Sequence, residues 1–164
     1  MENQKIKIRL IVTHAKCSKC GYERTLYFST DNMYGERIVS TKSGKFCAYV
    51  NLLDESLAKE LEKYCIELFF ENSVSFSKSK IARIVSNIYG ITCDEIFDEK
   101  IDTIPNIKCV NCCNTTMVEK KEYGECLVDV EAFKVSHKCW NNLDKNGKKE
   151  AIRKELIRQG YIMD

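Results

Sequence analysis

Proline is almost absent from this sequence, and glycine and histidine are scarce. The 164 residues include a single proline, Pro105, seven glycines and two histidines. So little proline and glycine excludes collagen-like and low-complexity proteins and argues against long flexible linkers. Apolar runs are short, as at Leu10–Val12, so no segment is expected to span a membrane.

Ten cysteines stand out against these absences. A secreted protein would join them in disulfides, whereas a protein of a reducing compartment uses them for metal binding, redox chemistry or packing. The N-terminal residues lack the apolar stretch of a secretory signal, so we expect a cytoplasmic protein. Buried free cysteine behaves as a small apolar residue, and core packing is the default expectation for four of the ten: Cys47, Cys65, Cys93 and Cys126.

Neither sign of charge dominates the sequence. Lysine and arginine number 26 and aspartate and glutamate 24, a formal net charge of +2. No overall attraction to nucleic acid or to an anionic membrane is therefore expected. The charge is uneven, because residues 1–50 hold nine basic and four acidic side chains, and residues 51–76 hold two and six. The simplest interpretation is that the charged side chains of both segments lie on surfaces exposed to water. The alternative is that one of these surfaces binds a partner.

Two Cys-x-x-Cys turns carry the strongest chemical signal. Cys17 and Cys20 enclose two residues and are followed by Gly21, and Cys109 and Cys112 repeat the spacing. Two intervening residues let one tight turn offer both sulfurs to a metal, and zinc prefers four such ligands in a tetrahedron. The sequence therefore predicts one zinc ion held by all four thiolates. An iron–sulfur cluster could use the same ligands and is the less favoured cofactor.

Other residues offer alternative ligands for the metal. Cys113 stands where a glycine is expected after the second turn, and it could replace Cys112 as a ligand. The segment from His137 to Cys139 resembles a third turn that lacks its second cysteine. A rival site would join Cys109 and Cys112 to Cys126 and to either Cys139 or His137.

Alternating apolar residues predict a β-sheet built from both ends of the chain. In residues 5–12, Ile6, Ile8, Leu10 and Val12 share one face, which is the pattern of a half-buried strand. Both Cys-x-x-Cys turns lie beside strand-like segments, as a zinc ribbon requires. Further strands are expected at 22–29, 37–40, 45–50, 115–122 and 126–135.

Helical periodicity occupies the middle and the end of the sequence. Helices are predicted over 54–71, 80–89 and 145–160, with Asp54 and Ser79 as N-caps of the first two. The segment from Thr92 to Glu95 has the form of a capping box and predicts a short helix through Lys100. The expected core-facing residues are Leu57, Leu61, Tyr64, Cys65 and Leu68, then Ile81, Ile84, Val85 and Ile88, and finally Ile152 and Leu156.

These elements predict an α+β fold in a single domain over residues 1–164. A small antiparallel zinc-ribbon sheet would come from residues 5–50 and 106–135. A helical insertion at 54–100 and a C-terminal helix at 145–160 would complete the fold.

The two cysteine turns resemble those of zinc-ribbon proteins. The first turn, from Cys17 to Tyr22, with the extended run and the Met33–Tyr34 loop that follow, is similar to uncharacterised bacterial zinc-ribbon proteins with a helical insertion. The resemblance covers residues 14–50 and 106–122 and implies a fold and metal binding, with no activity attached. This chain departs from most ribbons in the 88 residues that separate Cys20 from Cys109.

The predicted site favours binding over catalysis. Four protein thiolates leave zinc no open position for water or substrate, and a redox Cys-x-x-Cys should open a helix, whereas a strand follows Cys20. We therefore expect an adaptor that contacts another protein, such as a regulator, an inhibitor or an immunity-type protein. The alternative is a nucleic-acid-binding ribbon, and an enzyme with structural zinc is the third possibility. Contacts to nucleic acid would come from Lys16, Lys19, Arg24 and Lys45.

Overall fold

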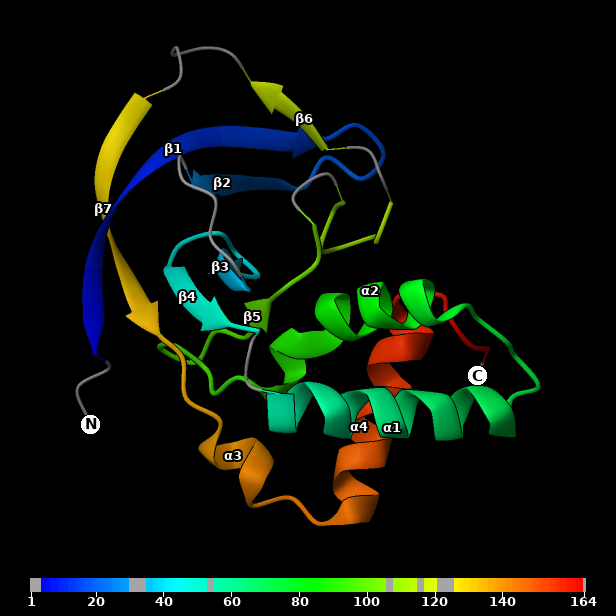
Figure 1. Cartoon of the computed structure of the whole chain (residues 1–164). Helices are drawn as coiled ribbons and strands as arrows, with labels where there is room; N and C mark the ends of the chain where they lie inside the picture. Colours follow the sequence, from blue (N-terminus) through cyan, green and yellow to red (C-terminus); the bar gives the residue numbers. More distant parts are fainter. Residues whose placement is uncertain are drawn as a thin grey trace.

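Seven strands and four α-helices form the protein in the computed structural model, which describes residues 4–29, 35–52, 55–105, 108–114, 117–120 and 126–163 (Figure 1). The predicted α+β class is confirmed. The strands are β1 (Lys5–Cys17), β2 (Glu23–Ser29), β3 (Glu36–Thr41), β4 (Cys47–Asn51), β5 (Ile101–Asp102), β6 (Met117–Lys120) and β7 (Cys126–Lys134). The helices are α1 (Glu55–Glu71), α2 (Lys78–Ile88), the 3-10 turn η1 (Tyr89–Thr92), α3 (Lys138–Asn141) and α4 (Lys145–Arg158).

The long strand β1 organises the sheet, whose order is β2-β1-β7-β4-β3-β5 with β6 beside the end of β1. Its first part pairs with β7 from Lys5 to Val12, and its last part pairs with β6 from His14 to Cys17. The alternation predicted for β1 is observed, because Leu10 is buried with Cys47 and Ala132 while Ile6, Ile8 and Val12 pack around them.

One pairing differs from the antiparallel ribbon that the sequence predicts. Strands β4 and β7 run parallel, with Cys47 opposite Ala132 and Tyr49 opposite Lys134. The chain leaves β4, builds the helices α1 and α2 and the second cysteine turn, and returns as β7. Parallel neighbours need a long crossover of this kind, which no local pattern announces.

The sheet curls so that β2 approaches the turn between β3 and β4. Tyr22 Oη donates to the carbonyl of Lys42 at 2.6 Å, and Tyr27 Oη donates to that of Gly44 at 3.1 Å. Gly44 has φ of +75°, and a Cβ there would lie 2.7 Å from the backbone nitrogen of Thr25. Glycine is therefore required at this turn, because any side chain would push the two strands apart.

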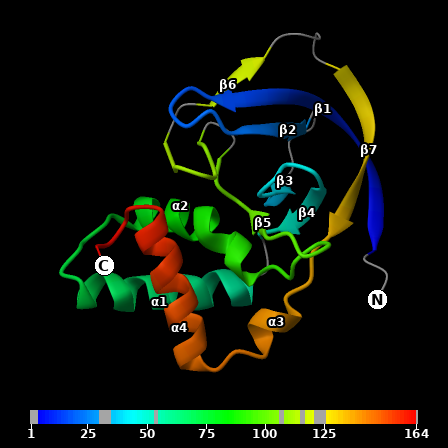
Figure 2. The ribbon, with the colours of Figure 1, turned by 180° about the vertical axis from the view of Figure 1, so that it is seen from behind.

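Helices α1, α2 and α4 gather on one side of the molecule, with β1, β2 and β6 toward the other (Figures 1 and 2). The residues predicted to face the core in α1, α2 and α4 are buried, apart from half-buried Ile81, and they share one core cluster with Trp140. Ser77 rather than Ser79 caps α2, and Asp144 caps α4. The predicted cap Asp54 and the Met33–Tyr34 loop lie outside the described residues. Among the described helices, none is both long and apolar enough to cross a membrane.

The helix predicted over 93–100 is wrong. The 3-10 turn η1 ends at Thr92, and Ile96 then bridges Glu99 across a tight turn in which Phe97 and Asp98 have φ of 49° and 63°. Asp94, which lies inside the predicted capping box, interacts with another element. Its carboxylate accepts hydrogen bonds from the backbone nitrogens of Lys138 and Cys139, at 2.9 and 2.8 Å, and so caps α3.

Ion pairs join acidic side chains of α1 to basic side chains of α4. The Nζ of Lys148 lies 2.9 Å from a Glu60 carboxylate oxygen, and that of Lys149 lies 2.9 Å from Glu71. Arg153 also reaches Glu71, at 3.0 Å. Partly exposed pairs such as these contribute at most about 1 kcal/mol each. Glu60 and Glu71 of the acidic segment are therefore paired with basic side chains of α4.

Candidate metal centre

The first Cys-x-x-Cys turn, residues 17–22, is here called the first knuckle. Cys17 ends β1, and the chain reverses before β2 starts at Glu23. The Cys17 nitrogen donates to the carbonyl of Tyr22 at 2.8 Å, and the Gly21 nitrogen donates to the carbonyl of Cys17 at 2.9 Å. Gly21 has φ of +75°, a conformation that glycine adopts without steric cost. The turn thereby holds both cysteines on the same side of the chain.

Residues 109–114, the second knuckle, repeat this hydrogen-bond pattern at the same spacing. The Cys109 nitrogen donates to the carbonyl of Asn114 at 2.8 Å, and the Cys113 nitrogen donates to that of Cys109 at 2.8 Å. Cys113 has φ of +56°, so it occupies the left-handed position that Gly21 fills in the first knuckle. A non-glycine residue in that conformation costs on the order of 1–2 kcal/mol. The second knuckle keeps its geometry despite this strain.

The two knuckles bring four sulfur atoms together. Cys17 Sγ lies 3.7 Å from Cys112 Sγ, and Cys20 Sγ lies 3.6 Å from Cys109 Sγ. All four sulfurs lie within 4.8 Å of one another. Zinc–sulfur bonds of about 2.3 Å in a tetrahedron place the sulfurs about 3.8 Å apart, so the observed spacing fits a tetrahedral metal ion. These cysteines, here called the four-cysteine group, could therefore bind a metal.

Burial and hydrogen bonding differ around the four thiols. Cys17 and Cys109 are buried, and Cys20 is exposed. Burial raises the pKa of the Cys109 thiol to about 12, whereas hydrogen bonds from Asn114 lower the pKa of Cys112 below its usual value. Four thiolates this close repel one another, and a bound divalent cation removes that penalty because a coordinated thiol is deprotonated outright. The chemistry of the donor set fits a cation.

The alternative ligands lie elsewhere in the structure. Cys113 Sγ points to Arg158, whose Nη1 lies 3.7 Å away. The His137 ring lies against Thr92, with Nδ1 2.9 Å from the Thr92 carbonyl, and Cys139 is exposed beside Asp94. None of the three belongs to the four-cysteine group. The Cys126 side chain is not among the described atoms, and its backbone pairs with Val12 of β1.

The basic residues expected to contact nucleic acid are divided between surface and interior. Lys16, Lys19 and Lys45 are exposed. Lys16 lies 3.3 Å from Glu23, and Lys19 donates to the side chain of Asn114 at 3.4 Å. Arg24 is instead 5% exposed, and its guanidinium donates to Ser40 Oγ inside the curled sheet.

A buried charge group beside the second knuckle escaped the sequence analysis. Arg158, in the last turn of α4, donates to the carbonyl of Val110 at 2.9 Å and lies 3.5 Å from Asp102. Arg158 also pairs with Glu155 at 2.5 Å. Asp102 is 4% exposed, and burial raises the pKa of its carboxyl above the usual value. These contacts fasten α4 to the second knuckle, and no spacing rule in the sequence signals them.

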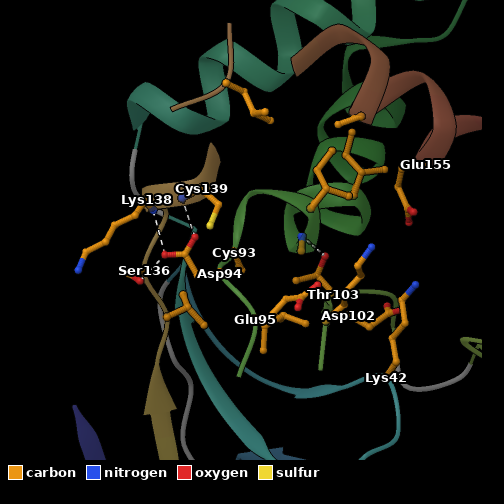
Figure 3. Close-up of a pocket in the computed structure, with 18 of the residues that line it drawn as sticks. Lys42, Cys93, Asp94, Glu95, Asp102, Thr103, Ser136, Lys138, Cys139 and Glu155 are labelled. Atoms are coloured by element: carbon orange, nitrogen blue, oxygen red, sulfur yellow. Dashed lines mark hydrogen bonds between the residues drawn. The ribbon is translucent and has the colours of Figure 1, made fainter. Parts of the chain in front are cut away.

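A cleft of about 1110 Å³ lies between η1, β5, α3 and α4. One part holds Asp94 with the groups it binds, Ser136, Lys138 and Cys139 (Figure 3). Asp102 and Glu155 lie in another part of the same view. Both acidic and basic side chains line this cleft. No member of the four-cysteine group lines it.

Comparisons with protein-family models, with curated proteins and with solved structures give no match. The fold class and the four-cysteine group are thus defined by the geometry alone.

Replacing Cys113 with glycine separates the ligand role from the backbone role of this residue. The variant relieves the strained φ and keeps the four-cysteine group intact, so we expect bound metal to stay at the wild-type stoichiometry. Cys112→Ser, the matched change one position earlier, should lower the metal affinity. Metal content after gel filtration in a weak chelator measures both. Loss of metal from Cys113→Gly alone would show that Cys113 is a ligand.

Proposed function

We propose that this protein is a metal-stabilised binding module, in which the four cysteines hold one zinc ion and the folded chain contacts another protein. The observation that supports the metal is the approach of two knuckles, separated by 88 residues, to sulfur–sulfur distances of 3.6 and 3.7 Å. Four thiolates leave zinc no open position, so its role is structural. The likeness to zinc ribbons belongs to the same proposal, and it rests on the two knuckles.

A protein partner is supported by apolar side chains on the outer face of α1. Ile66 and Phe70, one turn apart, are 48% and 85% exposed. Glu60, Glu67 and Glu71 of α1 form ion pairs with α4. The proposed partner surface on α1 is therefore the apolar pair Ile66 and Phe70 rather than these acidic side chains. Large aromatic side chains are enriched where proteins bind each other. The proposal places the chain in a reducing compartment such as the cytoplasm, because oxidation would remove the thiolate ligands.

Elemental analysis joined to a thiol count tests the metal. The purified protein should carry one zinc ion per chain, and a chelator should raise the number of reactive thiols by four. Protein that carries no metal when purified under reducing conditions with zinc supplied would contradict the proposal. Iron with sulfide in place of zinc would assign an iron–sulfur cluster instead.

Partner capture with a matched variant tests the binding role. Wild-type protein should retain one discrete protein, and Phe70→Glu should lose it while keeping its metal content and its melting temperature. Retention on DNA or RNA that weakens steeply with salt, and that Phe70→Glu leaves unchanged, would favour the nucleic-acid alternative. The exposed lysines Lys16, Lys19 and Lys45 would then be the first residues to replace.

A further inference from the structure

Arg24 is a buried cation whose hydrogen bonding is incomplete. The residue is 5% exposed and donates through Nη2 to Ser40 Oγ. Among the described residues, its Nε and Nη1 have no hydrogen-bond partner. A charge taken out of water without full hydrogen bonding is costly unless opposite charge lies nearby. The position of Arg24 therefore calls for a source of negative charge inside the protein.

Arg24 neighbours the first knuckle in the sheet and interacts electrostatically with a cysteine of the second. In the pairing of β1 with β2 it stands opposite Ala15, two residues before Cys17. Burial lowers the pKa of Arg24 from its usual value, while Asp102 and Cys109 act on it electrostatically in the opposite direction. The guanidinium is thus within electrostatic range of a ligand from the second knuckle and close in the sheet to a ligand from the first.

The Asp102 carboxylate is paired with Arg158 rather than with Arg24. The Asp102 and Arg158 side chains lie 3.5 Å apart, and the Oδ2 atom of Asp102 has no hydrogen-bond partner among the described residues. Arg158 also pairs with Glu155, at 2.5 Å. In the part of the chain that the structure describes, no ion pair reaches Arg24. Four thiolates bound to a divalent ion carry a net charge of −2, which is a further source of negative charge near Arg24. Negative charge at the metal centre would offset the cost of burying Arg24.

We infer that Arg24 is the buried counter-charge of the metal centre and stabilises the excess negative charge of the four metal-bound thiolates. The inference rests on the proposed structural metal and goes beyond it, because it assigns a role to a residue that is not a ligand. Arg24 acts through its charge, and the Ser40 hydroxyl holds it in place. Metal affinity therefore depends on a residue of β2 as well as on the two knuckles.

Metal affinity in four variants tests this role. Arg24→Met removes the charge and keeps the length of the side chain, and Arg24→Lys keeps the charge. Ser40→Ala removes only the hydrogen bond, and Arg37→Met removes an exposed charge from β3. Competition for Zn²⁺ with a chromophoric chelator gives the affinities. The thiolate-to-metal absorption of the Co²⁺ form reports whether the sulfur shell is intact.

Arg24→Met is expected to bind metal about 10- to 100-fold more weakly, the usual effect of removing a group that supports a metal ligand. Arg24→Lys should retain most of the affinity, Ser40→Ala should weaken binding less than Arg24→Met does, and Arg37→Met should match the wild type. The Co²⁺ spectrum should stay that of four sulfur ligands in every variant that binds. A merely structural role of Arg24 would lower the melting temperature and leave the affinity of the folded protein unchanged.

Equal affinity of Arg24→Met and the wild type would overturn the inference. Should Arg24→Met fail to fold even with excess metal, the lysine variant decides the matter. If Arg24→Lys folds and binds metal, the charge of Arg24 is what matters and the inference is supported. If Arg24→Lys folds and binds no better than Arg24→Met, the inference is overturned. A wild-type protein that binds no metal contradicts the proposed function instead, so the two failures are distinguishable.

Discussion

Replacing Cys109 with alanine is expected to leave the chain unable to reach its folded state. Cys109 is fully buried, and its sulfur lies 3.6 Å from that of Cys20. Its replacement removes one of the four ligands and leaves a cavity in the protein interior. A structural zinc ion contributes on the order of 10 kcal/mol to folding. A whole domain is stable by only about 5–15 kcal/mol, so the loss approaches or exceeds the total. Circular dichroism during heating, with zinc in excess, measures the effect.

The matched control for this prediction is Cys139→Ala. Cys139 is exposed and stands apart from the four-cysteine group, so its replacement should change the stability by no more than about 0.5 kcal/mol. A Cys109→Ala variant that melts cooperatively at the wild-type temperature would contradict the structural role of the site. If both variants fail to fold, the cause would be oxidation of the remaining thiols during purification rather than loss of the metal.

Replacing Arg158 with methionine should be the most damaging change outside the cysteines, at about 3–5 kcal/mol of stability. The variant keeps the aliphatic part of the side chain and removes the cation that faces Asp102. It also leaves the carbonyl of Val110, in the second knuckle, without its donor. Chemical denaturation of metal-loaded protein measures the loss. Arg153→Met, which breaks a half-exposed pair with Glu71, is the control and should cost less than about 1 kcal/mol.

The deficit of Arg158→Met should shrink as the pH falls from neutral toward mildly acidic values. Burial raises the pKa of Asp102 above its usual value of 3.8 in the folded protein, and Arg158 acts to lower it. Without Arg158 the folded state takes up a proton more readily than the unfolded chain, so acid stabilises the variant relative to the wild type. A deficit that stays constant with pH would show that Asp102 is not the group left uncompensated.

Local patterns in the sequence predict most of the individual elements. The alternation of Ile6, Ile8, Leu10 and Val12 identifies one face of β1, because every second side chain of a strand points the same way. The spacing of apolar residues in α1 and α4 similarly predicts which faces are buried. The four-cysteine group follows from the chemistry of two short turns, and so it needs no knowledge of the path between them.

Features that depend on distant residues are the ones the sequence does not predict. The capping box from Thr92 to Glu95 predicts a helix that does not form. Asp94, inside this segment, instead caps α3, more than forty residues away. The basic residue Arg24 suggests a surface contact, and the curl of the sheet instead buries it beside Ser40. The parallel pairing of β4 and β7 likewise depends on how the whole chain packs. Each of these outcomes is decided by tertiary contacts that outweigh a local preference.

X-ray absorption at the zinc edge tests the central claim most directly, because it reports which atoms surround the metal in solution. Purified protein should show four sulfur neighbours at about 2.3 Å and no nitrogen or oxygen in the first coordination shell. A shell that contains nitrogen or oxygen, or fewer than four sulfurs per zinc ion, would contradict a closed four-cysteine centre formed by the two knuckles.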